Sequence, residues 1–117
     1  MGNVKIDSIR SVSSGTVGRA VSQARAARLA LDSSSRPHDD TLTNSEAFLA
    51  GVSSCGVTLI EMHAQETGVP LKRLAVTIEG ARTAEQPNRF AHVTMRFELD
   101  GVTQAQAEEL VKTYRGR

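Results

Sequence analysis

Cys55 is the side chain best suited to covalent chemistry, and it is the only cysteine in the 117 residues. It lies in SEAFLAGVSSCGVTLIEMHAQETGVP, the stretch from Ser45 to Pro70, which carries no charge between Glu46 and Glu61. A cysteine thiolate is a nucleophile that can be oxidised to a sulfenic acid. A thiol buried among apolar groups is instead an inert hydrophobe, and this is the more common role on an apolar face.

A reactive Cys55 needs a cation or hydrogen-bond donor that stabilises its thiolate, and this group must come from outside its own helix. Arg19 and Arg28 in the N-terminal strands and Arg36 in the following loop are the candidates, and the sequence does not choose among them. When the helix is projected at about 100° per residue, an uncharged face surrounds the cysteine. That face contains Phe48, Gly51, Val52, Leu59 and Met62.

The composition excludes several other kinds of function. Fourteen Lys and Arg residues against thirteen Asp and Glu give a net charge of +1, which predicts neither nucleic-acid nor membrane binding. A single cysteine excludes an internal disulfide and a Cys-rich zinc site, and it favours a cytoplasmic location. His38, Asp39 and Asp40 are adjacent in a loop rather than preorganised, so we expect no metal and no cofactor.

The hydrophobic pattern predicts one α+β domain over residues 1–117. The first segment, 1–32, alternates as a three-stranded β-meander, with a turn at Gly15 and Gly18. The segments that follow are a loop over 33–43, a central helix over 44–67, a β-hairpin over 71–99 and a C-terminal helix over 103–115.

Both helices have start and stop signals. Capping boxes, in which two residues satisfy each other's backbone donors, are predicted at the two helix starts by Thr43 with Glu46 and by Thr103 with Gln106. Gly68 followed by Pro70 is typical of the end of a helix. The longest uncharged run, residues 47–60, is shorter than the roughly 20 residues of a membrane span, so we expect a buried helix.

Two glycines lie inside this helix, and each costs about 1 kcal/mol relative to alanine. A close approach of another backbone at Gly51 and Gly56 would offset that loss. The helix is apolar on both sides, and a chain of this length cannot easily cover it. We therefore expect that a sheet and a second helix sandwich it, with part of the cover coming from a second subunit.

The stretch TNSEAFLAGVSSCGVTLIEMHAQETGVPLKRLAVTIEGAR resembles the cysteine-bearing helix and following strand of the OsmC/Ohr family, the osmotically inducible protein C and organic hydroperoxide resistance group. Glu46, Leu49, Ala50, Ser54 and Cys55 are in register with the family pattern, and the element order agrees more loosely along the whole chain. The resemblance implies an intertwined homodimer in which antiparallel sheets from both chains surround two central helices.

The resemblance also implies an activity. In active family members the helix cysteine reduces an organic or fatty-acid hydroperoxide, an arginine with a supporting glutamate stabilises the thiolate, and a second cysteine near the C-terminus forms a disulfide. A dithiol such as a lipoylated protein then reduces that disulfide. An apolar substrate would suit the residues around Cys55, namely Phe48, Val52, Leu59 and Met62.

This sequence departs from the family pattern at three places. It has no second cysteine, so it is either a one-cysteine member or a trimmed form of a longer chain, and it needs an external thiol. The supporting glutamate of the Ohr branch corresponds to Ser45, while Glu46 suits the cap better. The Ohr arginine corresponds to Thr16, and Arg19 is the nearest arginine.

Two functions follow from these observations. The first is a thiol-dependent peroxidase of the oxidative stress response, with Cys55 as nucleophile and Arg19 or Arg28 as the thiolate partner. The second is a noncatalytic dimeric module that binds a small hydrophobic ligand, with Cys55 as a buried structural thiol.

Overall fold

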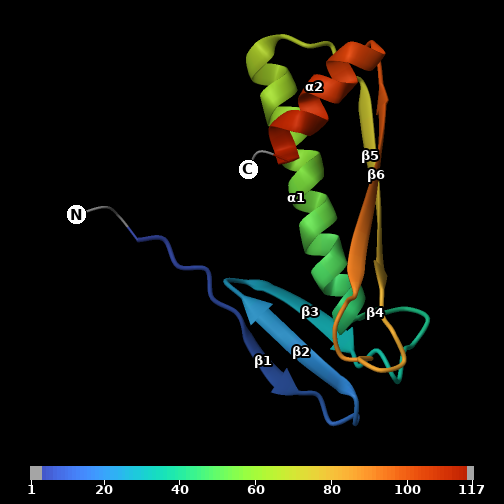
Figure 1. Ribbon diagram of the computed structural model, residues 1–117. Coiled ribbons are helices and arrows are strands. Elements are labelled where there is room, and N and C mark those ends of the chain that lie inside the picture. Colours follow the sequence, from blue (N-terminus) through green and yellow to red (C-terminus); the bar gives the residue numbers. More distant parts are fainter. Residues whose placement is uncertain (1–3, 116–117) are drawn as a thin grey trace. The chain divides into compact units, whose positions relative to one another are not determined.

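The computed structural model describes residues 4–115, which form two compact units divided between Phe48 and Leu49. This boundary lies within the long helix α1, Asn44–Thr67. Figure 1 shows the order of the elements along the chain, four strands, α1, a β-hairpin and a second helix. The α+β class predicted from the sequence is confirmed.

The first unit is a small sheet with the strand order β1-β2-β3-β4. Strands β1 (Arg10–Ser13), β2 (Arg19–Ala24) and β3 (Ala27–Asp32) form the predicted antiparallel meander, although β1 is shorter than its alternating sequence suggests. Gly15 and Gly18 have φ angles of 98° and 91°, which only glycine adopts readily, and they make the turn between the first two strands.

The predicted loop over 33–43 is wrong at its end. Leu42 and Thr43 form a short strand, β4, that pairs in parallel with Leu31 and Asp32 of β3. The other strand pairs are antiparallel, as expected. Two residues are too few to show a period of two, so the hydrophobic pattern cannot reveal such a strand.

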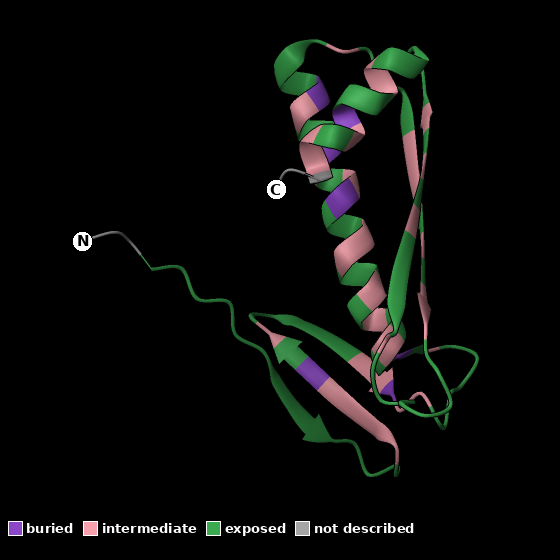
Figure 2. Ribbon diagram, in the orientation of Figure 1, coloured by how far each residue is buried: buried purple, intermediate pink, exposed green. Residues whose placement is uncertain are grey.

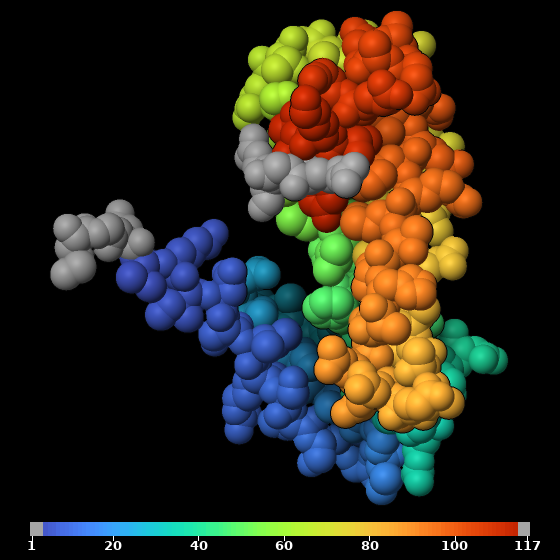
Figure 3. Space-filling view, viewed as in Figure 1, coloured from blue at the N-terminus to red at the C-terminus, as the bar shows by residue number. Residues whose placement is uncertain are grey.

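The second unit combines the part of α1 from Leu49 onward with the hairpin of β5 (Arg73–Ala81) and β6 (His92–Asp100) and with α2 (Gln104–Arg115). Its core is small. Figure 2 shows buried residues on both helices, and the apolar ones are Ile60, Ala64 and Leu110. Figure 3 shows α2 packed against the C-terminal part of α1. The side chains that surround this core are Val69, Leu71, Leu74, Phe97, Leu99, Val111 and Tyr114.

Both predicted capping boxes are confirmed. The Thr43 backbone N–H donates to Glu46 Oε1 at 2.9 Å, and the Glu46 N–H donates to Thr43 Oγ1 at 3.2 Å. Thr103 and Gln106 make the same reciprocal pair at 3.0 and 3.1 Å. Helix α1 ends in a Schellman motif, in which Gly68 has a φ of 72° and the Val69 N–H donates to the Ala64 carbonyl at 3.0 Å.

The chain covers helix α1 poorly. By length and composition alone α1 could also cross a membrane, as could the core helices of many soluble proteins. Only 17% of its most apolar stretch is buried within this chain. The buried helix predicted from the sequence is therefore not buried by this chain alone.

Candidate functional site

Cys55 is a free, exposed thiol in the middle of α1. Phe48 precedes it by seven residues and Met62 follows it by seven, so the three side chains lie on one helical face. Phe48 is 59% exposed and Met62 is 50% exposed, whereas Val52 and Leu59 on the same side are half-buried. The predicted apolar face therefore exists, and within this chain solvent reaches the sulfur.

The structure explains one helix glycine differently from the sequence-based prediction. A Cβ on Gly56 would lie 3.3 Å from Tyr114 Cζ, so the close neighbour is an aromatic ring of the same chain and not another backbone. The prediction of a close backbone is thus wrong for Gly56. Gly51 has nothing within 4 Å of its Cβ position. No contact within the described chain therefore explains why residue 51 is a glycine.

Arg19, the first candidate for the thiolate partner, is bound to a buried carboxylate. Its Nε donates to Asp32 Oδ1 at 2.7 Å, and one Nη donates to Asp32 Oδ2 at 3.2 Å and to Thr41 Oγ1 at 2.7 Å. The Asp32 side chain is fully buried, and the Arg19 side chain is 26% exposed. The bidentate geometry fixes the plane of the guanidinium group.

Asp32 also makes hydrogen bonds to the loop that follows it. The His38 backbone N–H and its ring Nδ1 lie 3.1 and 2.9 Å from Asp32 Oδ2. A carboxylate only accepts, so Nδ1 carries the donated proton. Hydrogen bonds from Arg19, with those from His38, hold the pKa of the Asp32 carboxyl well below its usual range, although burial opposes them. The same hydrogen bond raises the pKa of Arg19 above its ordinary value.

Asp32 belongs to no motif that marks it in the sequence. The sequence feature that could have indicated it is a carboxylate at the end of an apolar strand, followed six residues later by a histidine. His38 therefore has a structural partner. Among the residues that the structure describes, no group of three or more His, Cys, Asp or Glu side chains could hold a metal ion.

The other two arginines have less defined environments. Arg28 lies on β3 and is exposed. Arg36 lies in the loop, and its Cδ is 3.1 Å from the Cβ position of Gly18. Arg19, Arg28 and Arg36 all belong to the first unit, and Cys55 belongs to the second. Glu46 serves the cap, as predicted.

Comparisons with known proteins identify the family. A family model described as OsmC-like protein matches residues 37–117. The chain belongs to the OsmC-like family. The predicted resemblance is thereby confirmed. No curated protein matches the sequence.

Solved structures share the OsmC-like fold at low identity. An OsmC-like protein from Mycoplasma pneumoniae has a TM-score of 0.81 at 15% identity, with 97% of this chain and 82% of that chain covered. An organic hydroperoxide resistance protein OsmC from Legionella pneumophila has a TM-score of 0.67 at 19% identity, covering 95% and 82%. One from Elizabethkingia anophelis, also called an organic hydroperoxide resistance protein, has 0.70 at 12%, covering 96% and 82%.

Proposed function

We propose that this OsmC-like protein is a thiol-dependent peroxidase that reduces organic hydroperoxides through Cys55. In the reaction the thiolate sulfur attacks the outer oxygen of the hydroperoxide, an S–O bond forms and the O–O bond breaks. The sulfur becomes a sulfenic acid, and the departing alkoxide takes up a proton to give an alcohol. The observation that carries the proposal is a solvent-accessible thiol on an apolar face of a helix in a chain of this family.

An apolar peroxide suits this face better than hydrogen peroxide. Phe48, Val52, Leu59 and Met62 lie on the same side of α1 as the sulfur, and the first and last are at least half exposed. Covering one such side chain with the hydrocarbon part of a substrate is worth roughly 1.5–3 kcal/mol. The names of the Legionella and Elizabethkingia proteins point to the same class of substrate.

Arg19 or Arg28 supplies the positive charge near the thiolate. Asp32 already orders the Arg19 guanidinium, which lowers the entropy lost when it binds an anion. Arg28 is exposed and carries no such restraint. We therefore rank Arg19 above Arg28.

We also propose that a second copy of the chain covers exposed surface of α1 outside the face that carries Cys55, giving a homodimer. The sequence contains one cysteine, so an external thiol or a dithiol such as a lipoylated protein attacks the sulfenic sulfur and releases water. A second thiol then displaces Cys55 from the mixed disulfide and restores the reduced enzyme.

Stopped-flow mixing with cumene hydroperoxide tests the proposal. We expect peroxide consumption by the wild type and trapping of the sulfenic acid by dimedone, both lost in Cys55→Ser. Ser54→Ala, a change at the neighbouring exposed residue, is the matched control and should keep the activity. Arg19→Ala should slow the reaction much more than Arg28→Ala. Equal consumption by wild type and Cys55→Ser would remove the proposed function.

A second candidate function is noncatalytic binding of a small hydrophobic ligand, which the exposed Phe48 and Met62 favour. In that case a fluorescent fatty acid should bind to the wild type and to Cys55→Ser with the same affinity, and peroxide should not be consumed. Loss of binding in Phe48→Ala would identify the face involved.

A further inference from the structure

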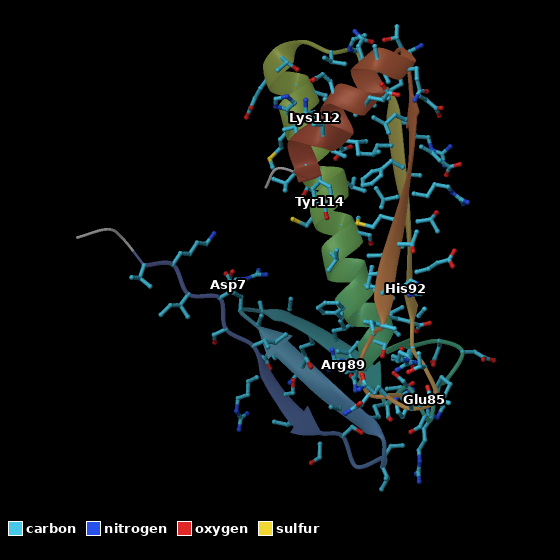
Figure 4. All side chains as sticks on the ribbon, viewed as in Figure 1. Asp7, Glu85, Arg89, His92, Lys112 and Tyr114 are labelled. Carbon is cyan, nitrogen blue, oxygen red and sulfur yellow. The ribbon has the colours of Figure 1, made fainter. Side chains whose placement is uncertain are left out.

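Tyr114 lies against the turn of α1 that carries Cys55. It is at the end of α2, and Figure 4 shows it over α1. Its Cζ is 3.3 Å from the Cβ position of Gly56, the residue after the cysteine. Its ring also packs against Phe97 with a centroid distance of 5.9 Å and an interplanar angle of 60°. The absence of a side chain at Gly56 gives the phenol ring its place.

The hydroxyl group of Tyr114 is held only weakly. It donates to the Val52 carbonyl oxygen at 3.5 Å and lies 3.9 Å from the Met95 sulfur. Ordinary O–H···O hydrogen bonds are about 2.7–2.8 Å long, and thioether sulfur is a weak acceptor. Within the described part of the chain this half-buried hydroxyl has no short hydrogen bond. It is therefore able to donate a hydrogen bond to a better acceptor.

The geometry of a helix places this hydroxyl beside the cysteine face. Measured around the axis from Gly56, Val52 lies about 40° away and Cys55 about 100° away in the same direction. A helical side chain also leans toward the N-terminus, so Cys55 covers the turn that contains Val52. At a side-chain radius of about 5 Å, angles of about 60–100° correspond to roughly 5–8 Å between the hydroxyl and the sulfur.

We propose that the Tyr114 hydroxyl donates a hydrogen bond to the leaving oxygen of the hydroperoxide while Cys55 attacks the other oxygen, an inference that rests on the proposed function. The spacing suits such an arrangement. A sulfur in attack position is about 3 Å from its oxygen, and a hydrogen bond to the leaving oxygen adds about 2.8 Å. These two distances and the O–O bond between them together match the separation inferred between the Cys55 sulfur and the Tyr114 hydroxyl.

The electrons and the proton balance in this step. The sulfur lone pair forms the S–O bond, the O–O pair leaves on the alkoxide, and the outer oxygen keeps its hydrogen as the sulfenic acid. The alkoxide gains its proton through the hydrogen bond from Tyr114, and solvent restores the phenol. Because negative charge develops on the leaving oxygen only as the O–O bond breaks, the donor stabilises the transition state more than the bound substrate.

Tyr114→Phe tests the proposal, because it removes the hydroxyl and keeps the ring on Gly56. We expect a loss of about 10- to 100-fold in the second-order rate with cumene hydroperoxide. Peracetic acid, whose leaving carboxylate is a weak base, should show a loss of less than about threefold. Alkylation of Cys55 by iodoacetamide has no leaving oxygen and should not change.

Gly56→Ala is a second variant, and its methyl group should displace the phenol and give the same pattern of losses. Lys112→Ala, at an exposed position of α2, is the control and should react as the wild type does. A Tyr114→Phe protein that reduces cumene hydroperoxide at the wild-type rate would overturn the role of Tyr114 and leave the proposed function intact.

Two other outcomes would also overturn the inference. Equal slowing with all three reagents would show that Tyr114 supports only the packing around the cysteine. No Cys55-dependent consumption by the wild type would remove the proposed function, and the role of Tyr114 with it.

Discussion

Alanine at each of the two helix glycines should change the stability of the protein in different ways. Alanine is favoured over glycine inside a helix by about 1 kcal/mol. Gly51 has nothing within 4 Å of its Cβ position, so Gly51→Ala should raise the free energy of unfolding by that full amount. At Gly56 the new methyl group would lie 3.3, 3.5 and 3.6 Å from three carbon atoms of the Tyr114 ring.

The crowding at Gly56 opposes the gain in helix propensity. Overpacking of this kind costs about 1–3 kcal/mol. The net change for Gly56→Ala therefore lies between about zero and 2 kcal/mol of destabilisation. In a Tyr114→Ala background the ring is absent, and Gly56→Ala should then stabilise by about 1 kcal/mol.

Urea unfolding followed by far-UV circular dichroism measures all four proteins against wild type. The coupling between Gly56→Ala and Tyr114→Ala should be about 1–3 kcal/mol, since the two groups are in contact. Additive effects, or equal stabilisation by Gly51→Ala and Gly56→Ala, would refute the packing described for Tyr114. Measurements at two protein concentrations separate effects within one chain from effects on a dimer. If Gly51→Ala lowers the free energy of unfolding by an amount that depends on protein concentration, a second copy contacts the helix at that position.

Asp32→Asn should lower the free energy of unfolding at neutral pH. It should also make that free energy fall less steeply as the pH decreases. The pKa of Asp32 is lowered in the fold, so its contribution is present above the unfolded pKa of about 3.9 and is lost as the pH falls below that value. Urea midpoints at several pH values between neutrality and strong acid test this, and an unchanged acid slope would contradict it. Thr43→Ala should cost about 1 kcal/mol through loss of the cap. Thr103→Ala offers the matched cap on α2, and an unfolding midpoint equal to wild type in either variant would contradict the reciprocal bonds.

The elements that could be predicted are those specified by neighbouring residues. The bounds of α1, 44–67, follow from Thr43 with Glu46 at one end and Gly68 at the other, and the structure has the same bounds. These signals act over three or four residues and need no knowledge of tertiary contacts. The hairpin and α2 were predictable for the same reason, since alternation and a capping box are local.

The features that were missed depend on contacts distant in sequence. The ring of Tyr114 meets Gly56 across 58 residues, and the spacing of neither residue predicts the other. Burial of Asp32 depends on Arg19, thirteen residues earlier, and on a loop that folds back over it. A charged side chain is buried only when its partners are in place, so the sequence around Asp32 alone predicts an exposed residue.

The N-terminus of α1 connects the charged cluster to the helix that carries the cysteine. Thr43 pairs with Asp32 in the β3–β4 register and is also the N-cap of α1, so one buried residue belongs to both. The bonds that hold Arg19 and His38 on Asp32 thus end beside the first turn of the helix. This continuity explains why a short parallel strand is present where a loop would otherwise suffice. It orders the entry to α1 by hydrogen bonds, and the exposed Cys55 lies further along the same helix.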